Sequence, residues 1–324
     1  MIMALTEKAL RFFQSQNKLL QLENLFIEVR VKLFRRFRPS SHPFVSGDTF
    51  RTYAHVKLDE VTGRSMSQMG KMLRRLLTVP NCNVNLFIDL HCTLEVKGQE
   101  EILNWLRTFD LSLCQKFSLI LHNHDIVPSW GFFASLDRLS IKCYCPNVLD
   151  NDFGAVPIPL GIENRYFQKS GVVRHFPKAR ESLSNSIETR PIGIFASFNI
   201  QTNQMERQEA ADSVIRFGHE FNQSRIRPNE FRRMLAKSLF VISPPGNGID
   251  CHRTWEAIYF GAIPVVKRKK LAESIYIDLP IYVVGDWSEI CSLSRSQLED
   301  LYSVVIKKSA DKAYFEYWKN AISK

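Results

Sequence analysis

The chain has 324 residues, of which 45% are hydrophobic, and it carries a formal net charge of +10. This length and composition predict about two globular domains with ample core, and they exclude a disordered or low-complexity protein. The basic balance favours an anionic partner such as a nucleotide, a nucleic acid or an acidic lipid surface.

Targeting signals are sparse. There is no run of about 18 apolar residues, so a membrane-spanning helix is not expected. The seven cysteines contain no CxxC pair, and we expect reduced thiols in a cytoplasmic protein. Residues 1–38 are basic and amphipathic. Such a segment can bind an anionic membrane peripherally at its inner face, or it can pack on the body of the protein, and both alternatives stay open.

Residues 39–170 predict a first α/β domain in which strands alternate with helices. We expect strands at 43–46, 84–90, 117–121, 141–144 and 156–159. We expect helices that begin at residue 52 and span 65–77 and 100–109. This alternation is typical of a parallel, doubly wound sheet.

A polar linker is predicted at 171–190, followed by a second α/β domain over 191–305 and a C-terminal helix within 306–324. In the second domain we expect strands at 192–197, 239–242, 262–266 and 282–284. The expected helices are at 207–221, 229–238, 250–259 and 294–307.

The stretch 239–266 reads as strand, glycine loop, helix and strand. Residues 243–248 (SPPGNG) cannot continue a strand, Asp250 is a good helix N-cap, and Gly261 stands where a left-handed residue ends helices. Ligands in open α/β sheets bind outside the carboxyl ends of the strands, where a helix N-terminus offers free N–H groups. The stretch therefore predicts an anion-binding site.

Two charged residues follow in the helix. Arg253 lies in its first turn and has the bidentate fork that suits phosphate. Glu256, three residues on, shares its face and could accept hydrogen bonds from the hydroxyls of a ribose. The neighbouring glycines would let a nucleotide approach the backbone. The same spacing also fits an ordinary βαβ turn whose Arg253 and Glu256 pair at the surface.

The sequence SPPGNGIDCHRTWEAIYFGAIPVV resembles the donor-binding motif of exostosin-like glycosyltransferases (glycosyltransferase family 47), which have a GT-B fold. The N-terminal half resembles the family more loosely. The residues that match the family pattern are Ser243, Gly246, Gly248, Asp250, Arg253, Glu256, Ala257, Gly261 and Pro264.

The resemblance implies an α/β, GT-B-like architecture with two Rossmann-like, doubly wound domains that face a central cleft. It implies an inverting, metal-independent glycosyltransferase with no cofactor. The donor would be a nucleoside-diphosphate sugar linked to UDP, and the acceptor a glycan or glycolipid hydroxyl in polysaccharide or surface-glycan biosynthesis. The C-terminal helix would cross back onto the first domain. The implied donor-binding residues are Asn203, Arg207, Ser243, Gly246, Asn247, Gly248, Asp250, His252, Arg253 and Glu256.

The first domain would supply the acceptor site and a base, which must remove a proton from the attacking hydroxyl. Asp48 follows the first predicted strand and is our leading candidate, although it could simply cap a helix. Arg51, one turn along, would hold Asp48 ionised and contact substrate.

A second polar loop, His122-Asn123-His124-Asp125, ends another strand. Asp125 is the second candidate base, and His122 and His124 would bind the acceptor. A metal site in this loop is not expected, because a third ligand of known spacing is missing. Glu163 and Asn164, in the segment PIPLGIENR at the domain junction, either bind substrate or belong to a rigid connection.

Two other functions stay open. One is a non-catalytic protein that binds nucleic acid or another acidic polymer, for which the run Lys267-Arg268-Lys269-Lys270 offers charge. That run has no interleaved aromatic residues, so nucleic acid is not the expected partner. The other is a fucosyltransferase-like GT-B enzyme that uses a GDP-sugar. Asp150 and Asp152 have the Asp-x-Asp spacing of metal-dependent transferases, but no nucleotide-binding context surrounds them.

Overall fold

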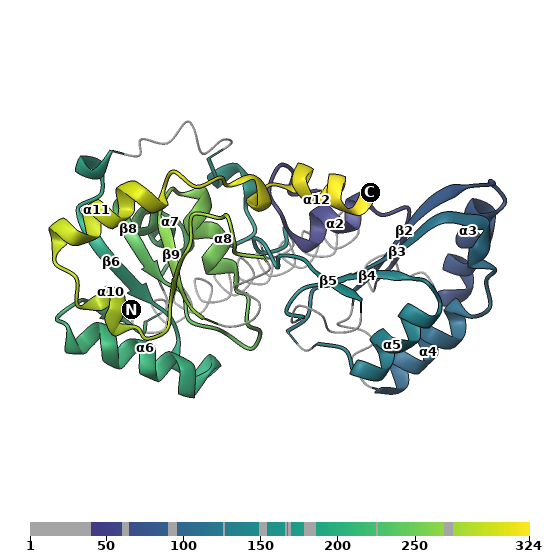
Figure 1. Ribbon diagram of the computed structural model, residues 1–324, viewed down its shortest axis with the longest axis horizontal. Helices are drawn as coiled ribbons and strands as arrows, with labels where there is room; N and C mark the ends of the chain where they lie inside the picture. Colours follow the sequence, from purple (N-terminus) through teal and green to yellow (C-terminus); the bar gives the residue numbers. More distant parts are fainter. Residues whose placement is uncertain are drawn as a thin grey trace, which may run out of the picture. The chain divides into compact units, whose positions relative to one another are not determined.

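The computed structural model describes residues 40–59, 65–89, 96–125, 127–148, 154–165, 167, 170–177, 186–224, 226–268 and 275–324. The amphipathic segment 1–38, Asp150 and Asp152 lie outside these residues. The described chain forms two parallel β-sheets of five strands each, covered by helices (Figure 1). This confirms the predicted α/β, Rossmann-like class. No helix in these ranges is long and apolar enough to cross a membrane.

The first sheet has the strand order β1-β2-β3-β4-β5. Its strands are Val56–Leu58, Cys82–Asp89, Cys114–His122, Lys142–Cys145 and Ala155–Pro157. Because the order never reverses and parallel crossovers are right-handed, the connecting helices lie on one face. These helices are α3 (Met66–Leu77), α4 (Val96–Leu106) and α5 (Trp130–Arg138), and they share one apolar cluster with the sheet (Figure 1).

The other face of this sheet is covered by α2 (Gly47–Tyr53) and by the C-terminal helix α12 (Phe315–Ser323). The rings of Phe50 and Phe315 lie 5.3 Å apart, edge to face. Trp318 is buried in the same cluster as Tyr144 of β4. The end of the chain therefore packs on the first sheet, as the family resemblance implies.

The second sheet has the order β10-β9-β8-β6-β7. Its strands in chain order are β6 Ile192–Ser197, β7 Phe221–Asn222, β8 Ser238–Ile242, β9 Ile263–Lys267 and β10 Tyr282–Val284. One face packs on α6 (Gln204–Arg216), α10 (Ser288–Cys291) and α11 (Arg295–Val305), the other on α7 (Pro228–Lys237) and α8 (His252–Tyr259). The order reverses between β6 and β8, and such a switch point is where ligands commonly bind in open α/β sheets.

Several predicted elements differ in the structure. Residues 43–46 are not a strand, because Phe44 makes only an isolated bridge to Tyr314. Ser46 caps α2 by accepting from the Thr49 N–H, so the helix begins at Gly47 instead of residue 52. The predicted helix 207–221 ends at Arg216. Strands β1 and β7 were not predicted, since strands of two or three residues are too short to show a period. The nine-residue helix α5 was not predicted either.

The described part of the predicted linker 171–190 packs against the second sheet's helices. Phe176 is buried beside Phe260, with ring centroids 5.5 Å apart. Arg190 is also buried, and its guanidinium donates to the carbonyls of Ser238 and Phe260 at 2.8 and 2.9 Å. Both ends of this segment therefore contribute to the core.

Candidate functional site

Two loops meet at the switch point of the second sheet, one after β6 and one after β8. Arg207 of α6 is buried and donates to the carbonyls of Pro245 (2.8 Å) and Asn199 (2.7 Å). Asn203 donates to the Gly246 carbonyl at 2.9 Å. Burial, reinforced by the charge of Arg253, lowers the pKa of Arg207 to about 10. These hydrogen bonds show that Arg207 and Asn203, both predicted to bind donor, fasten one loop to the other.

The glycine loop is closely packed. A Cβ on Gly246 would lie 3.1 Å from Arg207, and one on Gly248 would lie 2.5 Å from the Asn147 amide. Ser243 is buried, and its hydroxyl lies 2.9 Å from that of Thr254. The space over Gly248, where we predicted that a nucleotide approaches the backbone, is filled by the Asn147 side chain in the structure.

Asp250 is not the N-cap of α8. The cap position is Cys251, and no side chain caps the helix. The Asp250 carboxylate is buried and accepts hydrogen bonds from the Leu160 N–H (2.8 Å), the Trp255 indole and the Tyr276 hydroxyl (2.5 Å). Burial raises its pKa even though these bonds favour the charged form. Asp250 therefore has a structural role, and no side chain among the described residues caps the N–H groups that begin α8.

Arg253 differs from Arg207 in the hydrogen bonding of its guanidinium group. Its charged centre lies 5.5 Å from the centre of the Phe198 ring. Its Nε and Nη1 atoms are buried and have no hydrogen-bond partner among the described residues. Buried donors without partners are rare, and each costs about 1–3 kcal/mol. An arginine left in this state beside an uncapped helix start can bind an anion.

Glu256 lies one turn further along α8 and is 9% exposed. No described residue donates a hydrogen bond to its carboxylate. Burial raises the pKa of Glu256 to about 7, although the charges of His252, Arg232 and Arg253 oppose this shift. The switch point thus holds a buried acid and a buried cation whose polar atoms are not used by the fold.

A hollow of about 180 Å³ lies at the carboxyl edge of the first sheet and is completed by His252 of α8. It brings together six residues predicted for the donor or acceptor site. Its lining residues are Gly47, His122, Asn123, His124, Asp125, Leu160, Ile162, Glu163, Asn164, Phe167 and His252. Asp125 is exposed, and its Oδ2 accepts from the Asn247 amide at 3.0 Å.

Asp48, our leading candidate base, is fully buried in α2 and does not follow a strand. Its Oδ2 accepts from the Arg165 N–H at 2.7 Å, and its own N–H donates to the Asn164 side chain at 2.9 Å. Asn164 donates to Asn123 (2.7 Å), which donates to Asp89 (2.8 Å). We call Asp48, Asp89, Asn123 and Asn164 the amide network. Because this network encloses Asp48, we assign it a structural role.

Arg51 was predicted to bind substrate and to hold Asp48 ionised. Instead its Nε donates to Asp59, and both side chains are buried. The structure therefore places Arg51 in a buried ion pair and not among the residues that line the hollow described above.

His122 uses both ring nitrogens within the protein. Nδ1 accepts from the Asn123 N–H at 2.9 Å, and Nε2 therefore carries the proton and donates to the Pro159 carbonyl at 3.2 Å. Burial lowers the pKa of His122 to about 4, so the ring is neutral at pH 7. His124 is buried, with Nε2 3.7 Å from the Cys145 sulfur. In the described ranges, no three His, Cys, Asp or Glu side chains come together as a metal site.

His252 and Glu163 lie close together in the hollow. The His252 Nδ1 donates to the Gly161 carbonyl at 2.6 Å, and its Nε2 lies 3.5 Å from Glu163 Oε2. Burial lowers the pKa of His252, but Glu163, the Gly161 carbonyl, Glu256 and Asp250 raise it, and the net shift is upward.

Two larger cavities lie outside this hollow. One, of about 570 Å³, is lined by Ser197, Phe198, Asn199, Gln223, Ser224, Ile226 and Phe231. It shares the Phe198 ring with Arg253 and therefore adjoins the switch point. The sequence did not point to Gln223 here, because the short strand β7 before it went unpredicted, and it did not single out Phe231 within the predicted helix 229–238.

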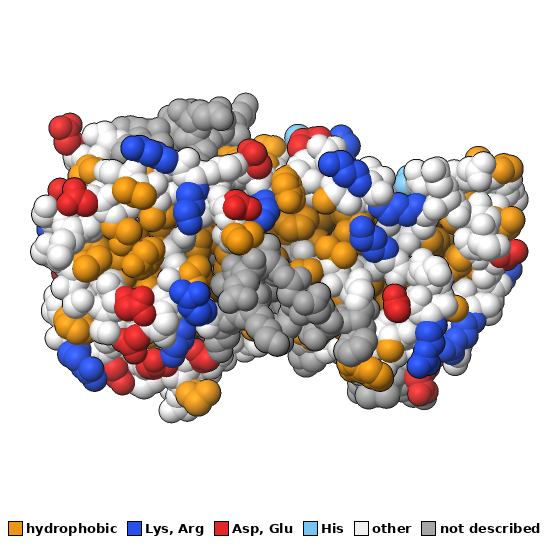
Figure 2. Space-filling view, in the orientation of Figure 1, with side chains coloured by type: hydrophobic (Ala, Val, Ile, Leu, Met, Phe, Trp, Pro, Cys, Tyr) orange, Lys and Arg blue, Asp and Glu red, His pale blue; other side chains and the backbone are white. Residues whose placement is uncertain are grey.

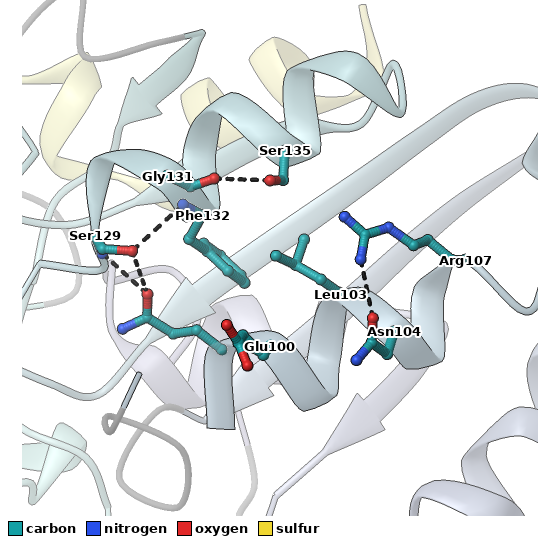
Figure 3. A pocket seen from close by; sticks show the side chains of 9 residues that line it. Glu100, Leu103, Asn104, Arg107, Ser129, Gly131, Phe132 and Ser135 are labelled. Carbon is teal, nitrogen blue, oxygen red and sulfur yellow. Dashed lines mark hydrogen bonds between the residues drawn. The ribbon is translucent and has the colours of Figure 1, made fainter. Parts of the chain in front are cut away.

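The other cavity, of about 530 Å³, lies between α4 and α5 (Figure 3). Its polar groups largely bond to one another. Gln99 accepts from the Ser129 N–H (3.1 Å) and hydroxyl (2.8 Å), and Arg107 donates to Asn104 at 2.9 Å. Since these groups are already paired and lie on the helical face of the sheet, we do not place the site there.

No protein-family model and no curated protein matches the chain. Among solved structures, the N-terminal domain of Candida albicans trehalose-6-phosphate phosphatase matches with a TM-score of 0.41 and 11% identity, over 79% of this chain and 74% of that one.

Proposed function

We propose that the protein is an inverting glycosyltransferase that moves a sugar from a nucleoside-diphosphate donor, linked to UDP, to a hydroxyl of a glycan or glycolipid acceptor. The observation that carries this proposal is the state of Arg253. Its buried Nε and Nη1 donors have no partner in the part of the chain that the structure describes, and they lie at the start of an uncapped helix. A diphosphate satisfies both features, because it accepts paired hydrogen bonds from arginine and is attracted by the helix dipole.

The surroundings of Arg253 fit the rest of a nucleotide. Glu256, on the same helix, offers a buried carboxylate that can accept from two ribose hydroxyls. The cavity beside Phe198 has an aromatic wall and can hold a nucleobase.

The proposed reaction depends on stabilising the negative charge of the leaving diphosphate. As the bond between sugar and diphosphate breaks, negative charge grows on the leaving group. Arg253 and the start of α8 are fixed in place to stabilise that charge, which is why a divalent ion is not required. The hollow beside His252 would hold the acceptor.

Calorimetry with UDP and with inorganic pyrophosphate tests the donor site. Arg253→Ala should weaken both by about tenfold or more, because a charged hydrogen bond contributes about 1.5–3 kcal/mol. The matched control is Arg233→Ala, whose exposed guanidinium pairs with Glu230 at 3.6 Å. Unchanged affinity of a folded Arg253→Ala protein for both ligands would reject the site. Titration with GDP in parallel separates a UDP enzyme from a fucosyltransferase-like enzyme.

Metal independence is a separate test. Release of UDP from a UDP-sugar should survive EDTA, whereas loss of turnover with rescue by Mn²⁺ would contradict this part of the proposal.

The second candidate function is binding of nucleic acid or another acidic polymer, which the net charge of +10 favours. On the face shown in Figure 2, however, lysine and arginine side chains are interspersed with acidic ones instead of forming one continuous patch. A larger thermal shift with oligonucleotides than with UDP would favour this alternative.

A further inference from the structure

We propose that His252 takes up the proton of the acceptor hydroxyl, and that Glu163 stabilises the imidazolium that results. This inference rests on the proposed function and gives its reaction a base that neither Asp48 nor a metal supplies.

The orientation of the His252 ring is fixed by its hydrogen bond. A carbonyl can only accept, so the 2.6 Å contact with Gly161 places the ring proton on Nδ1 and leaves the lone pair on Nε2. The Gly161 carbonyl is itself held in place. Gly161 has a φ of +70°, and any Cβ there would collide with the Val45 backbone. About one third of the His252 side chain is exposed, and it lines the hollow.

Glu163 is positioned to respond to a proton on Nε2. Its Oε1 accepts from the Asn164 N–H at 3.0 Å, which fixes the carboxylate. Its Oε2 lies 3.5 Å from the His252 Nε2, too far for a hydrogen bond but close enough for strong attraction once the ring is charged. A carboxylate that orients and stabilises an imidazolium is a common device in proton transfer.

The other side chains near this ring that could accept a proton are already used in hydrogen bonds. Asp48 is enclosed by the amide network, and both nitrogens of His122 are bonded within the protein. Asp125 reaches the hollow from the loop after β3, but one of its oxygens accepts from Asn247.

The charges around His252 come from several elements. Besides Glu163, the acids are Glu256 on α8 and Asp250 before it, and both raise the pKa of the ring. Arg253 on α8 and Arg232 on α7 act on Glu256. His122 on β3 faces the ring as a neutral group. The excess of acid favours a proton on His252.

Helix α8 points His252 and Arg253 in different directions. Consecutive residues of an α-helix point about 100° apart. His252 faces the hollow, while Arg253 faces Phe198. In the reaction, the acceptor O–H bond breaks and its proton moves to Nε2. The oxygen forms a bond to the anomeric carbon, and the bond to the diphosphate breaks with its electron pair remaining on the diphosphate at Arg253. Inversion requires the attacking oxygen and the departing diphosphate to lie on opposite faces of the anomeric carbon, and the different directions of His252 and Arg253 allow this.

The test measures UDP release from UDP-glucose, UDP-galactose and UDP-N-acetylglucosamine. His252→Asn keeps a donor for the Gly161 carbonyl but has no proton-accepting nitrogen. We expect kcat to fall by about 10²–10⁴-fold, with UDP affinity in calorimetry changed by less than about threefold. The matched control is His42→Asn, which removes an exposed histidine 3.3 Å from Glu316 and should leave turnover unchanged.

The pH profile separates a proton acceptor from a structural residue. In the wild type, kcat/KM should rise with pH as His252 loses its proton, with an apparent pKa above 6.5. Glu163→Gln should move this rise to lower pH, because the carboxylate that raises the pKa becomes neutral. His252→Ala should be partly rescued by added imidazole.

Three results would overturn the inference. A His252→Asn protein with normal turnover and an unchanged pH profile excludes the ring as base. If Asp125→Asn loses turnover and His252→Asn does not, the role belongs to Asp125. If the wild type binds neither UDP nor pyrophosphate and releases no UDP, the proposed function itself fails, and this inference fails with it.

Discussion

The two sheets carry polar clusters at their carboxyl edges that differ in one respect. In the amide network of the first sheet, Asn123 and Asn164 donate to their neighbours at 2.8 and 2.7 Å, and Asp48 accepts a backbone N–H at 2.7 Å. At the switch point of the second sheet, the buried donors of Arg253 and the carboxylate of Glu256 have no such partners among the described residues.

This difference separates structural polar groups from groups kept for a ligand. A buried network in which each member is paired stabilises one arrangement of the loops. A buried charge without a partner destabilises the protein until something binds it. Residue type alone does not distinguish the two cases, because arginine is paired at Arg207 and unpaired at Arg253, and carboxylates appear in both groups as Asp48 and Glu256.

The largest expected effect is the loss of folding stability that the buried Glu256 carboxylate causes as the pH rises. Burial raises its pKa to about 7 from an ordinary 4.5. The folded protein therefore binds this proton more tightly than the unfolded chain does, and stability falls as the pH rises from about 4.5 to about 7. The loss approaches about 3 kcal/mol. Glu256→Gln, which does not titrate, should remove it.

Denaturant unfolding at pH 5 and pH 8 measures this effect. The free energy of unfolding should fall less between pH 5 and pH 8 in Glu256→Gln than in the wild type. In the exposed control Glu230→Gln it should fall as much as in the wild type. Parallel pH dependence in Glu256→Gln and wild type would show that the carboxylate is already satisfied.

The next effect tests whether the amide network is as tightly packed as it looks. A Cβ on Gly47 would collide with the Asn123 side-chain oxygen and approach that of Asn164 to 2.9 Å. Gly47→Ala should therefore destabilise the fold by about 2 kcal/mol. Gly131→Ala is the matched control, because a Cβ there meets nothing within 4 Å and alanine is favoured in a helix. Equal stability of the two variants would mean that Asn123 and Asn164 can move aside at little cost in free energy.

The smallest effect is expected for Asp48→Asn. An asparagine oxygen can still accept from the Arg165 N–H, so we expect a loss of about 1 kcal/mol in stability. Turnover should stay within about tenfold, since the side chain does not reach the hollow. A fall in kcat of about 10²–10⁴-fold at full stability would instead restore Asp48 as the base, as first predicted from the sequence.

Much of the fold could be read from the sequence because long elements repeat their pattern several times. Strand β6 spans Ile192–Ser197 as predicted, and β2, β3 and α3 lie within two or three residues of the expected bounds. The start of α2 was missed because its cap, Ser46, stands in an apolar stretch that also suits a strand. Strands β1 and β7 have three and two residues and show no period.

The sequence by itself determined two parallel sheets, the loop between β8 and α8, and the presence of Arg253 and Glu256 at the start of that helix. These features depend on local pattern: apolar runs, turn residues and a helix register of 3.6 residues per turn. Gly261 belongs with them, since its φ of +73° is the left-handed conformation expected after a helix.

Only the tertiary structure decided which polar residues are used by the fold. Asp250 accepts from Leu160, 90 residues away, and the Asn147 side chain fills the space over Gly248. Arg207 and Arg253 look alike in the sequence, yet only Arg207 meets backbone carbonyls. The physical reason is that hydrogen-bond partners are set by long-range packing, which places residues distant in the chain within about 3 Å of one another.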